Sequence, residues 1–186
     1  MCGGRGSRLG GEAEKPLVRV CGDPMVDRVA AALAASRVET VHAVVSPAAP
    51  ETARHVRERG LSVVETAGEG YVADLTDALE AVGRPVVTVA ADVPHLAPDH
   101  VDAAVDEATA AADDAVSVTV CVPASLKRRL GVSVDTSFER DGEELAPTGL
   151  NVVAGDRDTV QLTFDDRLAV NVNRPTDLER AEALCD

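Results

Sequence analysis

A glycine-rich segment at the start of the chain concentrates positive charge. Residues 1–17 carry three cationic side chains and two acidic ones, in a chain whose formal net charge is -14. Their glycines let backbone N–H groups turn toward an anion, because no Cβ stands in the way. Cationic side chains in the same loop can neutralise a bound phosphate chain. The pattern therefore predicts a phosphate-binding loop, built from Gly3, Gly4 and Gly6 together with Arg5, Arg8 and Lys15.

Asp92 ends the clearest strand pattern in the sequence. Residues 84–92 form an apolar, β-branched run that closes on this carboxylate, which is typical of a strand buried on both faces in a parallel sheet. Open α/β sheets bind ligands at the carboxyl ends of their strands. We therefore expect Asp92 beside the bound phosphates, as a ligand of Mg²⁺. The alternative is an ordinary turn or helix-capping aspartate ahead of Pro94.

The opening segment differs from two common phosphate-binding motifs. A dinucleotide fingerprint would need glycine where Leu9 stands, and a Walker A loop would need Lys followed by Ser or Thr, a pair that the chain lacks. The pattern G-G-x-G-x-R, followed by E-K-P-L, instead resembles the opening signature of one nucleotidyltransferase superfamily. That superfamily contains the molybdenum-cofactor guanylyltransferases and the sugar-nucleotide pyrophosphorylases.

Further stretches narrow the resemblance to the archaeal GTP:adenosylcobinamide-phosphate guanylyltransferases. They are residues 14–17, 20–22, 66–71, 74–75, 148–153, 171–173 and 177–182. The resemblance implies transfer of GMP from GTP to adenosylcobinamide phosphate, giving adenosylcobinamide-GDP and pyrophosphate in cobalamin biosynthesis. The attacking phosphate is already an anion, so that catalysis needs positioning and charge neutralisation rather than a general base.

The same resemblance assigns roles to individual residues. Gly3, Gly4 and Gly6 would cradle the phosphates, while Arg8 and Lys15 would hold the β- and γ-phosphates and stabilise the leaving pyrophosphate. The alternative for these two cations is solvated surface charge. Further nucleotide-binding positions would be Ser7, Ser46, Thr66, Gly68, Gly70, Gly149 and Asn151, and Asn171 and Asn173 would join Asp92 around Mg²⁺ or the acceptor. Ordinary turn and strand-end roles remain the alternatives for these residues.

The elements that must position these residues alternate along one expected domain, residues 1–186. Helices are predicted over 24–35, 50–60, 72–82, 98–112 and 176–184, with a helical turn at 125–129. Strands are predicted over 38–46, 61–65, 84–92, 115–122, 132–138, 145–153 and 168–173. This order favours an α/β fold, a Rossmann-like three-layer sandwich with a mostly parallel central sheet. A buried strand normally leads into such a phosphate loop, and here only Met1 and Cys2 precede it, so we expect a truncated first strand.

Composition excludes several classes of function. Asp and Glu number 32 against 18 Lys and Arg, which is the wrong sign for a protein that binds nucleic-acid backbone. The acidic excess favours a halophilic origin and a high-salt cytoplasm, where surface repulsion is screened. No long apolar run predicts a membrane span. The scattered cysteines are interpreted as separate thiols in a reducing cytoplasm.

Two other functions remain open at this stage. One is a molybdenum-cofactor guanylyltransferase or another small transferase that uses a nucleoside triphosphate. The other is a non-catalytic nucleotide-binding module on the same fold. Arg8, Lys15 and Asp92 occur together, which favours an enzyme, because a sensor has no need of residues for a leaving group or a metal.

Overall fold

The computed structural model describes residues 1–2, 13–110 and 115–185. Its first half begins with the 3₁₀ turn η1 (Lys15–Leu17), followed by the short antiparallel pair β1 (Arg19–Val20) and β2 (Asp23–Pro24). Helix α1 (Met25–Ala34) comes next. A βαβ unit then follows, in which β3 (His42–Val45) and β4 (Ser62–Glu65) are parallel and α2 (Pro50–Glu58) connects them.

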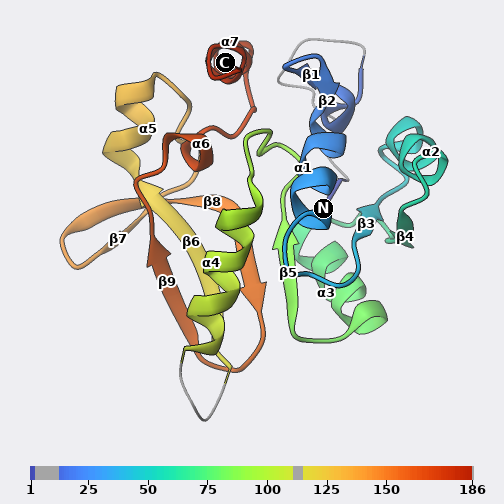
Figure 1. Ribbon diagram of the computed structural model, residues 1–186, viewed down its shortest axis with the longest axis horizontal. Helices are drawn as coiled ribbons and strands as arrows, with labels where there is room; N and C mark the ends of the chain where they lie inside the picture. The colour runs from blue at the N-terminus through green and yellow to red at the C-terminus, as the bar shows by residue number, and fades with distance from the viewer. Residues whose placement is uncertain (3–12, 111–114, 186) are drawn as a thin grey trace.

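The second half builds a mixed sheet in the strand order β5-β8-β6-β9, with β7 also paired to β8. Strand β8 runs antiparallel to both β5 and β6, whereas β6 and β9 are parallel. Strands β5, β6 and β9 therefore share one direction (Figure 1). Their bounds are β5 (Val86–Val89), β6 (Ser117–Pro123), β7 (Phe138–Arg140), β8 (Glu143–Val153) and β9 (Asp158–Leu162).

Helices pack against this sheet. Helix α4 (Pro98–Thr109) packs against β6 and β8, next to α1, and the core between them consists of Val, Ala and Leu side chains. Helix α3 (Tyr71–Val82) lies beside β5 (Figure 1). Small aliphatic side chains supply the core because aromatic residues make up only 2% of the chain. The remaining helices are α5 (Ala124–Leu130), α6 (Asp166–Ala169) and α7 (Pro175–Glu182).

The structure confirms the predicted α/β class and most of the elements. Two predicted strands are wrong. Residues 132–137 form no strand, because Val132 bonds back to the end of α5 and Ser133 bonds to α7. Residues 168–173 end α6 and then continue as a buried segment outside the sheet ladder. Periodicity does not distinguish such a buried segment from a strand. Strand β9 was not predicted, and residues 125–129 form part of a full helix rather than a single turn.

Met1 and Cys2 lie between β3 and β5. The amino group of Met1 donates to the carbonyl oxygen of Val89 at 2.9 Å, and Cys2 N donates to the carbonyl oxygen of Val44 at 2.8 Å. These two residues therefore pair with both strands at the point where the chain enters the glycine-rich segment.

The cysteines do not all remain thiols as the sequence suggested. Cys21 and Cys185 form a disulfide that links the β1–β2 turn to the end of α7. Their separation of 164 residues explains why spacing gave no sign of the pair. Cys2 and Cys121 are buried free thiols, and burial raises the pKa of Cys121 to about 11. Across the described ranges, no helix has the length and apolar character needed to cross a membrane.

Candidate active site

Lys15 and Asp92 meet at the carboxyl end of β5. The Lys15 Nζ lies 2.5 Å from Asp92 Oδ2 and 2.6 Å from Asn173 Oδ1. The Lys15 and Asp92 side chains are only 18% and 17% exposed, so water screens the pair less than it would at the surface. The structure thus brings together three predicted residues from three distant parts of the chain.

Asn171 also belongs to this cluster, and a buried lysine, Lys127, holds its side chain in place. Its Nδ2 faces Asp92 Oδ1 at 3.3 Å and donates to the carbonyl oxygen of Thr148 at 2.8 Å. Its Oδ1 accepts from Lys127 Nζ at 2.8 Å, and Lys127 also donates to the carbonyl oxygen of Ala169 at 2.8 Å. The amide orientation is therefore fixed, with its nitrogen toward Asp92 and its oxygen toward Lys127.

Lys127 is 4% exposed, and burial lowers its pKa, although the nearby carboxylates, Asp92 first among them, act in the opposite direction. Lysine is also rare in this chain. Lys15 and Lys127 are the only two lysines in a chain that otherwise uses arginine as its basic side chain. Both lysines reach the same cluster around Asp92.

Asp177 holds the segment that carries Asn173. Its side chain is fully buried at the start of α7. Asp177 Oδ2 accepts from the backbone N–H groups of Asn173 at 3.0 Å and Arg174 at 2.8 Å, and its Oδ1 accepts from Ser133 N at 2.7 Å. This carboxylate thereby ties the backbone next to Asn173 to the backbone at Ser133.

A cavity of about 290 Å³ adjoins the cluster. It is lined by Lys15 and Asp92 together with Ser46, Gly68 and Gly70, three of the positions assigned by resemblance. The β3–α2 and β4–α3 loops supply those three residues, so both loops meet the end of β5. The cavity therefore has Lys15 and Asp92 at one side and two connecting loops at the other.

Gly68 allows the two loops to approach closely. Its φ is +76°, and an added Cβ would lie 3.3 Å from the Ser46 Cβ. The Gly68 N–H donates to Asp74 Oδ1 at 2.9 Å, and that carboxylate is buried in α3. Thr66, another assigned position, does not line the cavity: it is buried and donates through Oγ1 to the carbonyl oxygen of Val45.

Two further assigned positions lie on β8, outside the lining of this cavity. Gly149 has a φ of +88°, and an added Cβ would lie 3.5 Å from Asn171 Nδ2, so this glycine borders the cluster from the sheet side. Asn151 pairs with Thr88 and Thr119 in the sheet. It lies two residues farther along β8 and is not part of the cluster.

The glycine-rich loop itself contributes one described anchor. Glu14, directly before Lys15, accepts from the backbone N–H groups of Glu51 at 2.9 Å and Thr52 at 2.7 Å at the start of α2. Burial alone would raise the pKa of Glu14, but these hydrogen bonds lower it overall. The predicted phosphate-binding residues Gly3, Gly4, Gly6, Ser7 and Arg8 lie outside the described residues.

The oxygen atoms around Lys15 suit a hard cation. Within the described ranges, no group of three His, Cys, Asp or Glu side chains gathers as a metal site. Mg²⁺ needs less than that, because it usually binds one or two carboxylates and takes its other ligands from water and substrate phosphates. Asp92 Oδ2 and Asn173 Oδ1 already converge on one cationic group, the Lys15 ammonium. Asn171 instead turns its nitrogen toward Asp92, an orientation that provides no metal ligand.

Sequence reasoning missed Lys127 and Asp177. The stretch K-R-R at residues 127–129 has the pattern of an exposed basic helix end, yet Lys127 points inward. The sequence signal that could have identified Lys127 is the rarity of lysine, because the chain contains only two lysines and this is one of them. Asp177 follows Pro175 at a helix start, where an acidic residue is common for helix stability alone.

Solved structures with a similar fold include a nucleotidyl transferase and a molybdopterin-guanine dinucleotide biosynthesis protein. A nucleotidyl transferase from Methanothermobacter superposes with a TM-score of 0.65 at 18% identity, covering 99% of this chain and 94% of that one. Molybdopterin-guanine dinucleotide biosynthesis protein A from Archaeoglobus fulgidus gives a TM-score of 0.61 at 19% identity, covering 99% and 95%. The fold is therefore that of the nucleotidyltransferases.

The family follows from the sequence match. The chain belongs to the family described as the MobA-like NTP transferase domain, which matches residues 1–142. It is also 29% identical to the adenosylcobinamide-phosphate guanylyltransferase of Methanocaldococcus jannaschii, over 99% of this chain and 94% of the relative.

Proposed function

We propose that this chain transfers GMP from GTP to adenosylcobinamide phosphate, producing adenosylcobinamide-GDP and pyrophosphate. The observation that carries the proposal is the convergence of Lys15, Asp92 and Asn173 beside a cavity lined by two connecting loops. The almost full-length similarity to the Methanocaldococcus relative supports the choice of nucleotide and acceptor.

The reaction needs no proton-abstracting residue. An oxygen of the corrinoid phosphate attacks the α-phosphorus of GTP, and the bond from that phosphorus to the α–β bridging oxygen breaks. The electron pair leaves with pyrophosphate. The nucleophile is an anion from the start, so the protein contributes alignment and positive charge.

Lys15 supplies that charge in the described part of the site. Its ammonium now bonds two oxygen atoms, from Asp92 and Asn173. When GTP enters, we propose that Lys15 exchanges these partners for β- and γ-phosphate oxygens, where it stabilises the departing pyrophosphate. Arg8 and the N–H groups of Gly3, Gly4 and Gly6 are proposed to complete the phosphate contacts, with Ser7 beside them.

Asp92 and Asn173 are the residues proposed to hold Mg²⁺. Both present an oxygen to the point that Lys15 occupies, and a bound Mg²⁺ would neutralise phosphate charge. Asn171 has a different proposed role, because Lys127 engages its oxygen and turns its nitrogen toward Asp92. Lys127 is thus a positioning residue, which acts on the carboxylate through Asn171.

The base and ribose are proposed to lie in the cavity between the β3–α2 and β4–α3 loops. Ser46, Gly68 and Gly70 line it, and Thr66 bonds to Val45, the residue before Ser46. Gly149 and Asn151 are proposed to face the acceptor side, since neither lines the cavity. Replacing Gly68 by Val should weaken GTP binding, because the new side chain would press on Ser46.

Pyrophosphate release tests this function. Each of GTP, ATP, CTP and UTP is paired with adenosylcobinamide phosphate and, separately, with molybdopterin, in molar KCl with Mg²⁺. Release with GTP and the corrinoid alone is the expected result. Release with molybdopterin would identify a molybdenum-cofactor enzyme instead, and nucleotide binding without release for any acceptor would indicate a non-catalytic module. The variant Asp92→Asn serves as the matched inactive control.

We also propose that residues 1–186 act as one domain in a high-salt cytoplasm. The net charge of -14 supports this setting, because like charges repel less when the Debye length falls to about 3 Å at 1 M salt. The free energy of unfolding should then rise as KCl increases from millimolar to molar concentrations. A folding transition indifferent to KCl would contradict the halophilic assignment.

A further inference from the structure

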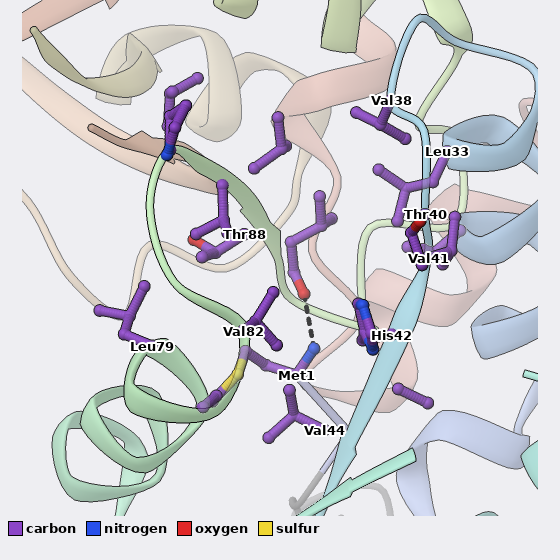
Figure 2. Close-up of a pocket in the computed structure, with 18 of the residues that line it drawn as sticks. Met1, Leu33, Val38, Thr40, Val41, His42, Val44, Leu79, Val82 and Thr88 are labelled. Carbon is purple, nitrogen blue, oxygen red and sulfur yellow. Dashed lines mark hydrogen bonds between the residues drawn. The ribbon is translucent and has the colours of Figure 1, made fainter. Parts of the chain in front are cut away.

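The first turn of α3 faces the cavity of about 290 Å³, which we call the nucleotide cavity because the proposed function places GTP there. Tyr71 and Asp74 both line it, and their spacing of three residues puts them on one side of the helix. Later residues of α3 line a different cavity, of about 640 Å³, between β3 and β5. Figure 2 shows two of them, Leu79 and Val82, in that larger and mostly apolar space. The first turn of α3 is therefore the part that a bound nucleotide would meet.

Asp74 brings a carboxylate oxygen without a partner to the nucleotide cavity. The residue is only 8% exposed. Its Oδ1 accepts from the Gly68 N–H at 2.9 Å, whereas its Oδ2 has no hydrogen-bond partner among the residues that the structure describes. A carboxylate oxygen in so buried a position normally accepts hydrogen bonds, because burial removes it from water. The Oδ2 atom therefore suits a ligand that enters the cavity with N–H donors.

Guanine is the base whose edge matches this carboxylate. Its N1–H and its 2-amino group are adjacent donors, and an ionised carboxylate is an acceptor only. Adenine and cytosine present a ring-nitrogen acceptor beside their amino group, and uracil has a carbonyl oxygen on each side of its N–H. Each of these three bases would bring a lone pair against the carboxylate. The contact is thus favourable along the whole edge only for guanine.

Tyr71 supplies an aromatic surface beside this carboxylate. The chain has one tyrosine, two phenylalanines and no tryptophan, so an aromatic side chain on the nucleotide cavity is a rare feature here. Tyr71 is 51% exposed, which leaves much of its surface available to a ligand. A base that stacks on an aromatic side chain gains affinity whatever its identity, because every base has a π-face. The ring can therefore bind a base without selecting it.

We propose that Asp74 selects guanine, by accepting hydrogen bonds from N1–H and from the 2-amino group, while Tyr71 binds the base by stacking. The inference rests on the proposed function, which places the base of GTP in the nucleotide cavity. Lys15 and Asp92 line the same cavity, where they meet the phosphates. The cavity then has separate groups for the two ends of GTP, and the base-selecting groups come from α3.

Nucleotide analogues test the selection without any substitution in the protein. The Kd of each nucleotide is measured by calorimetric titration with Mg²⁺ in molar KCl, in the absence of the corrinoid. Inosine triphosphate lacks the 2-amino group, so it should bind at least about tenfold more weakly than GTP, the cost of one lost hydrogen bond to a charged group. Xanthosine triphosphate should bind more weakly still, because it places an oxygen at that position, against the carboxylate.

Asp74→Asn should reverse this preference. Asn keeps an oxygen for the Gly68 N–H and can turn its amide nitrogen into the cavity, where it donates to the 2-oxygen of xanthosine triphosphate. Compared with the parent protein, this variant should bind GTP at least about tenfold more weakly and xanthosine triphosphate more tightly. Asp77→Asn, at an exposed position of the same helix, is the matched control and should bind each nucleotide as the parent does.

Tyr71→Ala tests the stacking role. It should weaken GTP and inosine triphosphate by the same factor, about tenfold, because the base loses its aromatic platform while Asp74 still reads its edge. Unchanged affinity for both nucleotides would remove Tyr71 from the site.

Two results would overturn the role of Asp74. One is equal affinity of the parent protein for GTP and inosine triphosphate. The other is a parallel loss of GTP and xanthosine triphosphate binding in Asp74→Asn, which would show that the carboxylate only supports the loop at Gly68. Either result, obtained together with GMP transfer to the corrinoid, would leave the proposed function standing. Failure of every nucleotide to bind would overturn the proposed function and the selection by Asp74 together.

Discussion

Replacing Lys127 by Met should slow GMP transfer while leaving the fold intact. The Lys127 Nζ donates at 2.8 Å both to Ala169 O and to Asn171 Oδ1. Met fills similar space without a donor. The Asn171 amide is then free to rotate, and its Nδ2 is no longer held toward Asp92, 3.3 Å away in the structure.

The size of the effect follows from the bond that is lost. A hydrogen bond to a charged group contributes about 1.5–3 kcal/mol, which corresponds to about 10- to 150-fold in kcat if the whole loss falls on the transition state. Two buried acceptors lose their donor at about 1–3 kcal/mol each. Relief from burying an ammonium offsets part of that loss. We therefore expect the melting temperature to change by only a few degrees.

The assay is single-turnover transfer at saturating GTP, with the Kd for GTP measured separately. The rate should fall while the Kd changes less than threefold. In a double-mutant cycle with Asn171→Ala, the double variant should be no slower than Asn171→Ala alone, because Lys127 acts through Asn171. Lys127→Arg should restore part of the rate. Arg129→Met, on the same helix with a 70% exposed side chain, is the control and should be fully active.

Two results would refute this reasoning. An unchanged rate in Lys127→Met would show that the orientation of Asn171 does not matter for transfer. Rate losses that multiply in the double variant would show that Lys127 and Asn171 act independently.

Four further outcomes follow from the geometry. Lys15→Ala should lower pyrophosphate release at least about 100-fold, the usual cost of one lost transition-state donor, in a stopped-flow pyrophosphate assay. Asp177→Asn should lower the melting temperature and raise the KM for GTP, since its buried carboxylate accepts several bonds beside the site; unchanged values would remove it from the site. The Arg167 hydrogen bond lowers the pKa of Asp165 below its ordinary 3.8. The stability that the Asp165 carboxylate adds to the fold is therefore complete above about pH 4 and is lost as the pH falls further. Urea titrations should show that the free energy of unfolding depends less steeply on acid pH in Asp165→Asn. Gly149→Ala, at a φ of +88°, should cost about 1–2 kcal/mol in urea unfolding, and no loss would mean that the backbone relaxes there.

Much of the site could be predicted from strand order and spacing. Asp92 ends a buried apolar run, and Lys15 follows a glycine-rich loop, so the carboxyl edge of an α/β sheet brings them together. The structure places their side chains 2.5 Å apart. Asn173 came from resemblance alone, because a late asparagine has no pattern of its own. Its contact with Lys15 could not be derived from periodicity.

Other features depend on tertiary contacts that leave no local pattern. Lys127 lies in a basic stretch typical of an exposed helix end, and only packing against Ala169 and Asn171 buries it. The Cys21–Cys185 disulfide joins residues 164 apart in sequence. Residues 168–173 alternate as a strand would, yet Val170 and Val172 pack against Val20 of β1 and Ala181 of α7 rather than in the sheet. Each case is decided by neighbours that are distant in sequence.

Transfer of the α-phosphate tests the central claim most directly. GTP labelled at the α-phosphate is incubated with the protein, adenosylcobinamide phosphate and Mg²⁺ in molar KCl, and the corrinoid product is separated and counted. The account predicts label in the corrinoid from α-labelled GTP, none from γ-labelled GTP, and none with Asp92→Asn. Corrinoid that remains unlabelled while the protein binds GTP, or label that arrives from the γ-phosphate, would contradict it.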